Sequence, residues 1–187
     1  MKNIILASAS PRRKELLQLL DLNFEVIPAD IDESLSKNMT PYENVMYLAE
    51  SKARLISNNY PKQLVIGSDT IVVHNNIILG KPKDGLDAFN MLKQLSGTVH
   101  QVITGVSLQY EGSVDTFYSE TLVTFYSLTD QEINDYIKTG EPFDKAGAYG
   151  IQGRAAKFIE SIQGDYYTVV GLPIGQIYQK LKVYFKE

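Results

Sequence analysis

Cysteine is absent from this sequence, so disulfide bonds and thiolate metal sites are excluded. No hydrophobic run approaches the length of a membrane span, and no secretory signal pattern follows Met1, so we expect a cytoplasmic protein. The net charge is −4, without the basic excess of general nucleic-acid-binding proteins. Any anion that binds must therefore be held by a local basic cluster.

Hydrophobic residues make up 44% of the 187 residues, enough for a substantial core. The length fits one domain, or two lobes that share a sheet. No internal repeat or low-complexity tract divides the chain. His74 and His100 are not spaced from other potential metal ligands in a pattern typical of a metal site. We interpret both histidines as structural.

The segment 64–73 (LVIGSDTIVV) places an acid between two apolar, β-branched runs. Such runs are typical of strands buried on both faces, and Gly67 indicates a kink or a close approach of backbone. A buried Asp69 carboxylate costs several kcal/mol, roughly, unless a cation pairs with it. Asp69 is therefore either the cap of a turn between two short strands or an acid that faces a cation.

A basic helix start follows the first expected strand, residues 3–7. Ser10 can cap a helix whose first residue is Pro11, yet Arg12 and Arg13 lie in the first turn, where the helix dipole disfavours cations. The free N–H groups, the hydroxyl and two guanidiniums favour an anion cradle suited to a polyphosphate over solvated surface cations.

Lys52 lies on the apolar stripe of a helix that begins at a capping box, Thr40 to Glu43, and extends to about Ser57. A lysine on this face either extends to solvent or pairs with an anion, and Asp69 and a bound phosphate are the two available partners. In the acidic loop after a strand at 24–29, Asp30 and Asp32 are expected to be solvated. Glu33 is a candidate contact for a metal ion or for substrate.

The second half predicts a tight turn at 74–77, a return strand at 77–79, and Lys81 in a rigid loop that is either a phosphate site or solvated. We expect a helix after Asp84, long strands at 101–109 and 116–126, and a helix after Thr129. Residues 141–153 contain three glycines and form either a connector or a ligand-contacting loop. A last hairpin is predicted at 157–162 and 166–170, before a C-terminal helix.

These motifs together resemble the Maf family of nucleoside triphosphate pyrophosphatases. The matching stretches cover nearly the whole chain: SASPRRKELL at 8–17, DES at 32–34, AESKA at 49–53, GSDTIV at 67–72, GKP at 80–82, TGV at 104–106, ETLVTF at 120–125, AGAYGIQG at 146–153 and GLP at 171–173. Several separated motifs in the right order are far more specific than any one of them.

The resemblance implies a mixed α/β fold over residues 1–187, with a long twisted sheet and two lobes around a cleft, as in inosine triphosphate pyrophosphatases. It also implies cleavage between the α- and β-phosphates, a divalent cation (Mg²⁺ or Mn²⁺) and a homodimer. Asp69 matches the family's proton acceptor. Arg12, Thr70 and Gln152 match positions that separate its branches, and Thr70 with Gln152 resembles the dTTP/UTP branch.

We expect these residues to have two different roles, metal binding and substrate binding. Asp69 and Glu33 are the expected metal contacts, and Ser10, Arg12, Arg13, Lys52 and Lys81 are the expected substrate-binding residues. One Gln152 amide can donate to O4 and accept from N3–H of uracil or thymine. Two rival functions are a sugar-phosphate nucleotidyltransferase, which would require more glycine in the 8–13 loop, and a non-catalytic nucleotide sensor acting in septum formation.

Overall fold

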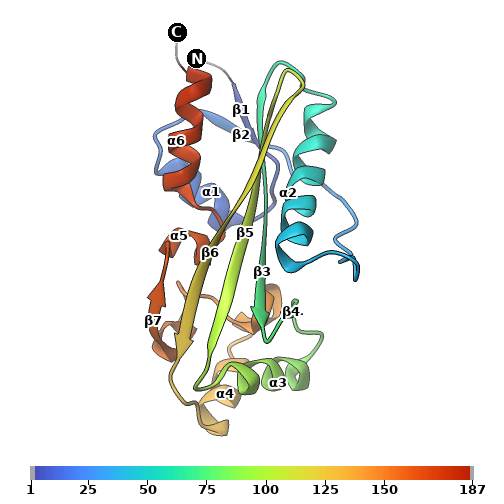
Figure 1. Cartoon of the computed structure of the whole chain (residues 1–187). Coiled ribbons are helices and arrows are strands. Elements are labelled where there is room, and N and C mark those ends of the chain that lie inside the picture. Colours follow the sequence, from blue (N-terminus) through green and yellow to red (C-terminus); the bar gives the residue numbers. More distant parts are fainter. Residues whose placement is uncertain (1–2, 186–187) are drawn as a thin grey trace. The chain divides into compact units, whose positions relative to one another are not determined.

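The computed structural model describes residues 3–185 and contains a mixed α/β fold (Figure 1). Seven strands form one sheet in the order β2-β1-β3-β5-β6-β7, with β4 paired to β3. The strands are β1 (Ile4–Leu6), β2 (Phe24–Val26), β3 (Leu64–His74), β4 (Ile77–Leu79), β5 (Val99–Tyr110), β6 (Ser113–Phe125) and β7 (Ile159–Gln163). The α-helices are α1 (Pro11–Gln18), α2 (Pro41–Ser57), α3 (Gly85–Leu95), α4 (Asp130–Ile137), α5 (Tyr166–Val170) and α6 (Ile174–Phe185). The mixed α/β class predicted from the sequence is confirmed.

The chain divides into two compact units. The first contains residues 1–69, 104–119 and 171–187, and the second contains residues 70–103 and 120–170. Strands β3, β5 and β6 each supply residues to both units, and Asp69 is the last residue of the first unit in β3. That the two units act as lobes around a cleft stays a prediction.

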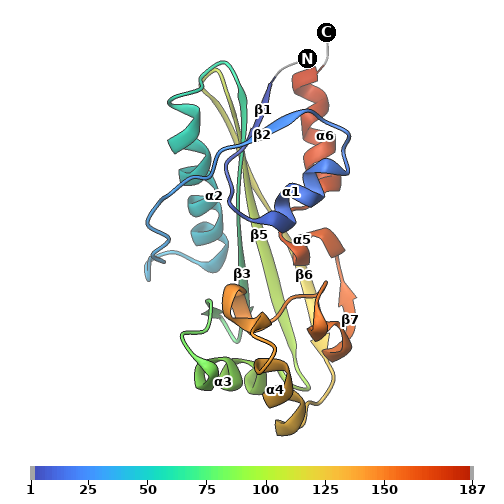
Figure 2. The same cartoon turned by 180° about the vertical axis from the view of Figure 1, so that it is seen from behind.

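In the first unit, parallel strands are covered by helices on both faces. β1 pairs in parallel with β2 and β3, with Ile5 opposite Glu25 and Val65. Helix α2 lies on one side of these strands, and α1 and α6 lie on the other (Figures 1 and 2). This double cover explains why β1 and the first half of β3 are uninterrupted runs of buried residues.

Two glycines allow α2 to approach the sheet closely. A Cβ on Gly67 would overlap the carbonyl oxygen of Ala49 and lie 2.7 Å from the backbone nitrogen of Ala53. A Cβ on Gly105 of β5 would overlap the carbonyl oxygen of Val45. The sequence predicted either a kink or a close approach of backbone at Gly67. In the structure the backbone of α2 approaches Gly67 closely, and β3 is continuous through this residue.

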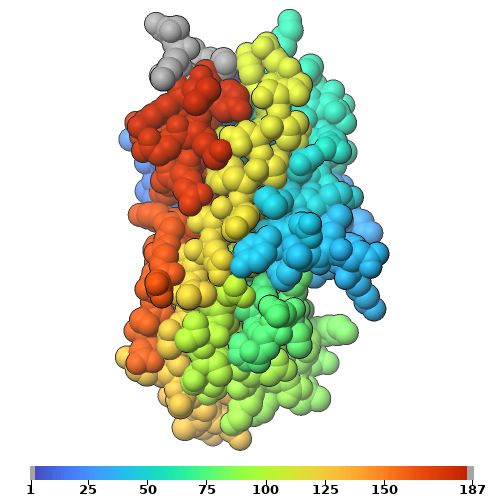
Figure 3. Space-filling view, in the orientation of Figure 1, coloured from blue at the N-terminus to red at the C-terminus, as the bar shows by residue number. Residues whose placement is uncertain are grey.

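Helix α6 lies against β6 on the surface of the same unit, where the space-filling view shows the two segments in contact (Figure 3). The Lys180 ammonium contacts Asp115 at 2.8 Å and lies 4.6 Å from the centre of the Phe117 ring. Gln176 donates to the Ser119 hydroxyl at 3.2 Å. These contacts attach the C-terminal helix to the hairpin that turns at Glu111 and Gly112, both with positive φ.

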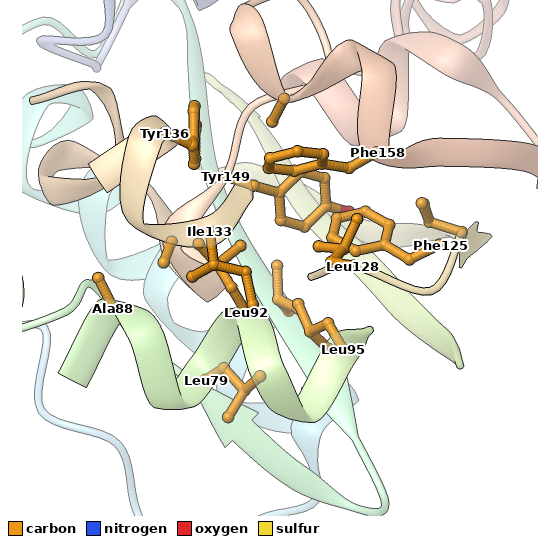
Figure 4. Packing of buried hydrophobic residues seen from close by; sticks show 14 of the residues in the cluster. Leu79, Ala88, Leu92, Leu95, Phe125, Leu128, Ile133, Tyr136, Tyr149 and Phe158 are labelled. Atoms are coloured by element: carbon orange, nitrogen blue, oxygen red, sulfur yellow. The ribbon is translucent and has the colours of Figure 1, made fainter. Parts of the chain in front are cut away.

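The second unit has its own hydrophobic core (Figure 4). It is built from α3, α4, the strands and the loops that follow α4, and its buried members include Leu92, Leu95, Phe125, Ile133, Tyr136, Tyr149 and Phe158. Edge-on aromatic contacts are prominent: the Phe125 and Tyr149 rings have centroids 4.8 Å apart, and the Tyr136 and Phe158 rings 5.3 Å apart.

One predicted element is wrong. Residues 166–170 form helix α5 instead of the second strand of a hairpin, and β7 pairs with β6, Val123 being opposite Ile162. The β-branched and aromatic residues of this segment favour a strand. However, the Asp165 carboxylate accepts hydrogen bonds from the Thr168 backbone N–H and hydroxyl, both at 2.8 Å, and so caps a helix start.

His100 is buried in the second unit and contacts the Tyr149 hydroxyl through Nε2 at 2.7 Å. Its Nδ1 has no hydrogen-bond partner among residues 3–185. Burial, and next the charge of His74, lower the pKa of His100 to about 3. The structural interpretation of this histidine therefore fits its surroundings.

We expect His100 to make the free energy of unfolding depend on pH. The unfolded chain takes up a proton near pH 6.5, and the native chain does so only near pH 3, so stability is complete above pH 6.5 and falls below it by roughly 1.4 kcal/mol per pH unit. His100→Gln retains a partner for Tyr149 but does not titrate. Between pH 7.5 and 5.0, urea unfolding of the wild type should lose about 2 kcal/mol more than that of the variant. Equal losses would contradict the assignment.

None of the helices within residues 3–185 is long and apolar enough to cross a membrane.

Candidate functional site

Lys52 joins two carboxylates in the first unit. Its Nζ lies 2.6 Å from Asp69 Oδ1 and 2.6 Å from Glu33 Oε1. The Lys52 side chain is 7% exposed, Asp69 14% and Glu33 52%, so the ion pair extends from the interior toward solvent. From the sequence, Lys52 could extend to solvent or pair with Asp69 or a bound phosphate. In the structure it pairs with Asp69, and also with Glu33.

The local structure of α2 explains why Lys52 points inward. The Thr40 hydroxyl accepts from the Glu43 backbone N–H, and the Glu43 carboxylate accepts from the Thr40 N–H at 2.7 Å, which fixes the start of the helix. From this start, Lys52 falls on the buried face, beside the closely packed Gly67 of β3. Asp69 follows two residues later on the same face of that strand, within reach of Lys52.

The Glu33 loop is fastened by a buried side chain, Asn44, on α2. Asn44 accepts from the Ser36 backbone N–H at 2.8 Å and donates to the carbonyl oxygens of Ser36, Met39 and Thr40. The exposed Asp32 accepts from the backbone and hydroxyl of Ser34, and these hydrogen bonds lower the pKa of Asp32. The loop therefore has defined contacts on both sides of Glu33.

Arg13 is fixed at the start of α1. Its Nε donates to the Gly171 carbonyl oxygen at 2.9 Å and its Nη1 to Ser8 Oγ at 3.3 Å. Ser10 is the N-cap of the helix, as predicted, with the Arg13 N–H directed at its hydroxyl. Burial lowers the pKa of Arg13, the Asp69 carboxylate raises it, and the charge of Arg12 lowers it. The charges of Asp69 and Arg12 therefore act on Arg13 within this unit.

Sequence reasoning missed three groups that support this site: Ser8, Ser68 and Gly171. Ser68, fully buried beside Asp69 in β3, donates to the Gly171 carbonyl oxygen at 3.3 Å, so Gly171 accepts from both Ser68 and Arg13. Gly171 has φ +124°, which disfavours other residues there. The motif at 171–173 was noticed, but nothing in its composition indicated that its backbone would bind Arg13.

The other predicted site residues belong to the second unit. Thr70 follows Asp69 in β3, Lys81 is exposed after β4, and Gln152 is exposed in the loop after Tyr149. Within this unit, the Gly147 N–H donates to the Gly80 carbonyl oxygen at 3.0 Å, so the predicted phosphate loop and the glycine-rich loop contact each other. The structure thus groups Ser10, Arg12, Arg13, Glu33, Lys52 and Asp69 in one unit and Thr70, Lys81 and Gln152 in the other.

The carboxylate pair fits a divalent cation. Glu33 and Asp69 both contact the same positively charged nitrogen, so they already face one point at which a cation is stable. Residues 3–185 contain no group of three or more acidic, histidine or cysteine side chains suited to a metal. Magnesium commonly binds through one or two carboxylates and takes its other oxygens from water and substrate phosphates, which suits a site with two protein ligands.

A mixed α/β fold with a strand-borne carboxylate, a buried lysine and an arginine-bearing helix start defines an α/β protein equipped to bind phosphate groups. This chain belongs to the Maf-like protein family, whose model matches residues 3–184.

Curated relatives are similar over almost the whole chain. A dTTP/UTP pyrophosphatase of Bacillus pumilus (strain SAFR-032) is 51% identical over 184 residues, which cover 98% of this chain and 97% of the relative. A protein of the same name from Geobacillus sp. (strain WCH70) is 50% identical over 182 residues, covering 97% of this chain and 98% of the relative.

A solved structure, that of the Staphylococcus aureus Ham1 protein, aligns with a TM-score of 0.53 at 14% sequence identity. The alignment covers 98% of this chain and all of the other. This likeness supports the predicted fold.

Proposed function

We propose that this chain is a nucleoside triphosphate pyrophosphatase that hydrolyses dTTP and UTP to the monophosphate and pyrophosphate. The observation that carries the proposal is the contact of the Asp69 and Glu33 carboxylates with one buried ammonium, next to a fixed arginine. The names of the relatives, about half identical over nearly their full length, support the substrate class.

In this proposal, Asp69 accepts the proton of the water that attacks the α-phosphorus. Its side chain, in the middle of β3, is 14% exposed, so water can reach it. Arg13 and Lys52 stabilise negative charge on the departing pyrophosphate. Arg13 is held by Gly171 and Ser8 before substrate binds. The Ser10 hydroxyl, at the start of α1, offers a donor to a phosphate oxygen. Arg12 and Lys81 stay predicted phosphate contacts.

Glu33 and Asp69 would hold the divalent cation, Mg²⁺ or Mn²⁺. When bound, such a cation neutralises phosphate charge and makes a water easier to deprotonate. Lys52 would then exchange its contact with the carboxylates for a contact with phosphate, since the same nitrogen cannot satisfy both in full.

Release of pyrophosphate from a panel of nucleotides, with magnesium, with manganese and with chelator, tests the proposed function. We expect turnover of dTTP and UTP that exceeds that of the other canonical nucleotides and of 7-methyl-GTP, and that stops in chelator. Binding of UTP without turnover would favour the sensor alternative. Consumption of UTP only when a sugar phosphate is present would favour the nucleotidyltransferase.

Gln152 and Thr70 are proposed to select the base, and Gln152→Glu tests the first of them. A carboxylate accepts hydrogen bonds but cannot donate to O4 of uracil or thymine. We expect kcat/KM for dTTP and UTP to fall roughly tenfold relative to other nucleotides, the loss of about one hydrogen bond. The measurement is the set of kcat/KM values for both proteins over the same nucleotides, and unchanged ratios would remove Gln152 from base selection.

The homodimer and the cytoplasmic location stay predictions.

A further inference from the structure

Gln152 lies in a short closed turn. The Gly153 N–H donates to the Gly150 carbonyl oxygen at 3.1 Å, which leaves Ile151 and Gln152 at the two central positions. Gln152 is exposed, whereas the chain on its N-terminal side is buried through Tyr149. The position from which Gln152 presents its side chain therefore depends on how the two ends of this turn are held.

One series of hydrogen bonds holds both ends of this turn. Tyr136 of α4, 2% exposed, donates its hydroxyl to Glu141 Oε1 at 3.0 Å and accepts a hydrogen bond from the Gly150 backbone. The Glu141 carboxylate accepts from the Arg154 N–H at 3.0 and 3.1 Å. Burial, and then the Glu141 charge, raise the pKa of Tyr136, so its hydroxyl keeps the proton that it donates.

Close packing reinforces these hydrogen bonds. A Cβ on Gly153 would overlap the Glu141 carboxylate, 2.5 Å from its Cδ, and a Cβ on Gly150 would lie 2.8 Å from Cδ and Cε of Lys145. Lys145 in turn donates to the Glu141 carbonyl oxygen at 2.6 Å. Gly153 is thus required by the Glu141 carboxylate that holds the turn, whereas at Gly150 the end of the Lys145 side chain could shift aside.

A fixed turn matters because an amide is symmetric in shape but not in chemistry. Uracil offers an acceptor at O4 and a donor at N3, whereas cytosine offers a donor at N4 and an acceptor at N3. A glutamine free to rotate its amide by 180° would satisfy either base. Discrimination therefore requires the surroundings to hold one orientation and position.

We propose that Tyr136 and Glu141 are positioning residues for base selection and act by fixing the Gly150–Arg154 turn that presents Gln152. Neither touches the base. The inference rests on the proposed nucleotide specificity and extends it to residues that the resemblance did not single out.

The test compares equilibrium binding of UTP and CTP by calorimetry, in chelator so that hydrolysis does not interfere. Tyr136→Phe is the main variant, since it keeps the buried ring and removes only the hydroxyl. Glu141→Ala removes the carboxylate, and Glu141→Gln restores an acceptor. Glu132→Ala is the matched control, because Glu132 caps α4 through Thr129 in the same unit without contacting the turn.

We expect wild type to prefer UTP over CTP, and the ratio of dissociation constants to shrink at least fivefold in Tyr136→Phe and Glu141→Ala. Glu141→Gln should recover part of the ratio, and Glu132→Ala should retain all of it. Hydrogen exchange of the Gly150 and Arg154 amides should accelerate in Tyr136→Phe and Glu141→Ala, respectively.

A ratio unchanged in Tyr136→Phe despite faster exchange at Gly150 would overturn the inference. So would an equal change in Glu132→Ala, or wild-type protein that binds UTP and CTP alike. Pyrophosphate release by wild type is scored separately. A protein that prefers UTP but releases no pyrophosphate with magnesium defeats the proposed hydrolysis while leaving the positioning role supported.

Discussion

Asp69→Asn abolishes pyrophosphate release while leaving the fold intact, if Asp69 accepts the proton of the attacking water. The amide has the shape of the carboxylate but cannot take up that proton, so kcat should fall by roughly 10³, within the range typical of general-base removal. Lys52 keeps Glu33 as a partner at 2.6 Å, so the buried ammonium is not stranded. The free energy of unfolding should therefore change by less than about 2 kcal/mol.

The measurements are pyrophosphate release from UTP and urea unfolding of the same preparations. Asp115→Asn is the matched control, since Asp115 pairs with Lys180 in the same unit, outside the site. It makes the same chemical change and should leave turnover within about twofold, because a surface ion pair contributes little. Near-normal turnover by Asp69→Asn would refute the assigned role.

Lys52→Met should have two opposite effects. Turnover should fall by at least roughly 10², because a cation that stabilises the leaving pyrophosphate is lost. Binding of Mn²⁺ without nucleotide should become about tenfold tighter. The Asp69 and Glu33 carboxylates lose the ammonium that neutralises them and repel each other until another cation binds between them.

Calorimetric titration with Mn²⁺ at pH 7.5, without nucleotide, measures the second effect independently of catalysis. Lys180→Met is the control, because it frees a single surface carboxylate, Asp115. Adding Glu33→Gln to Lys52→Met should remove the gain in affinity. Weaker or unchanged Mn²⁺ binding by Lys52→Met would show that the carboxylate pair is not where the cation binds.

Features set by short-range chemistry were predictable from the sequence. The capping boxes at Thr40 and Thr129 fixed two helix starts, because each uses residues only three positions apart. Helical spacing then placed Lys52 on the buried face. The sequence left open whether Lys52 would extend to solvent or pair with Asp69 or a bound phosphate, and in the structure it contacts Asp69. The turn at Asn75 and Asn76 was also predictable, because asparagine tolerates the positive φ that both residues adopt.

Features set by distant partners were not predictable. Arg13 is held by a carbonyl 158 positions away, and nothing in residues 171–173 marks that backbone as an acceptor. At 166–170 the composition favoured a strand, but the Asp165 cap produced a helix. The glycine-rich segment was left as a connector or a ligand loop, because its order comes from Tyr136 and Glu141 contacts that no local pattern reveals.

The central claim is that water, deprotonated at Asp69, attacks the α-phosphorus. Hydrolysis of UTP by the wild type in ¹⁸O-labelled water, with magnesium and product analysis by mass spectrometry, tests it most directly. The account predicts one labelled oxygen in the monophosphate and unlabelled pyrophosphate. Label in the pyrophosphate, or production of a diphosphate and inorganic phosphate, would contradict it.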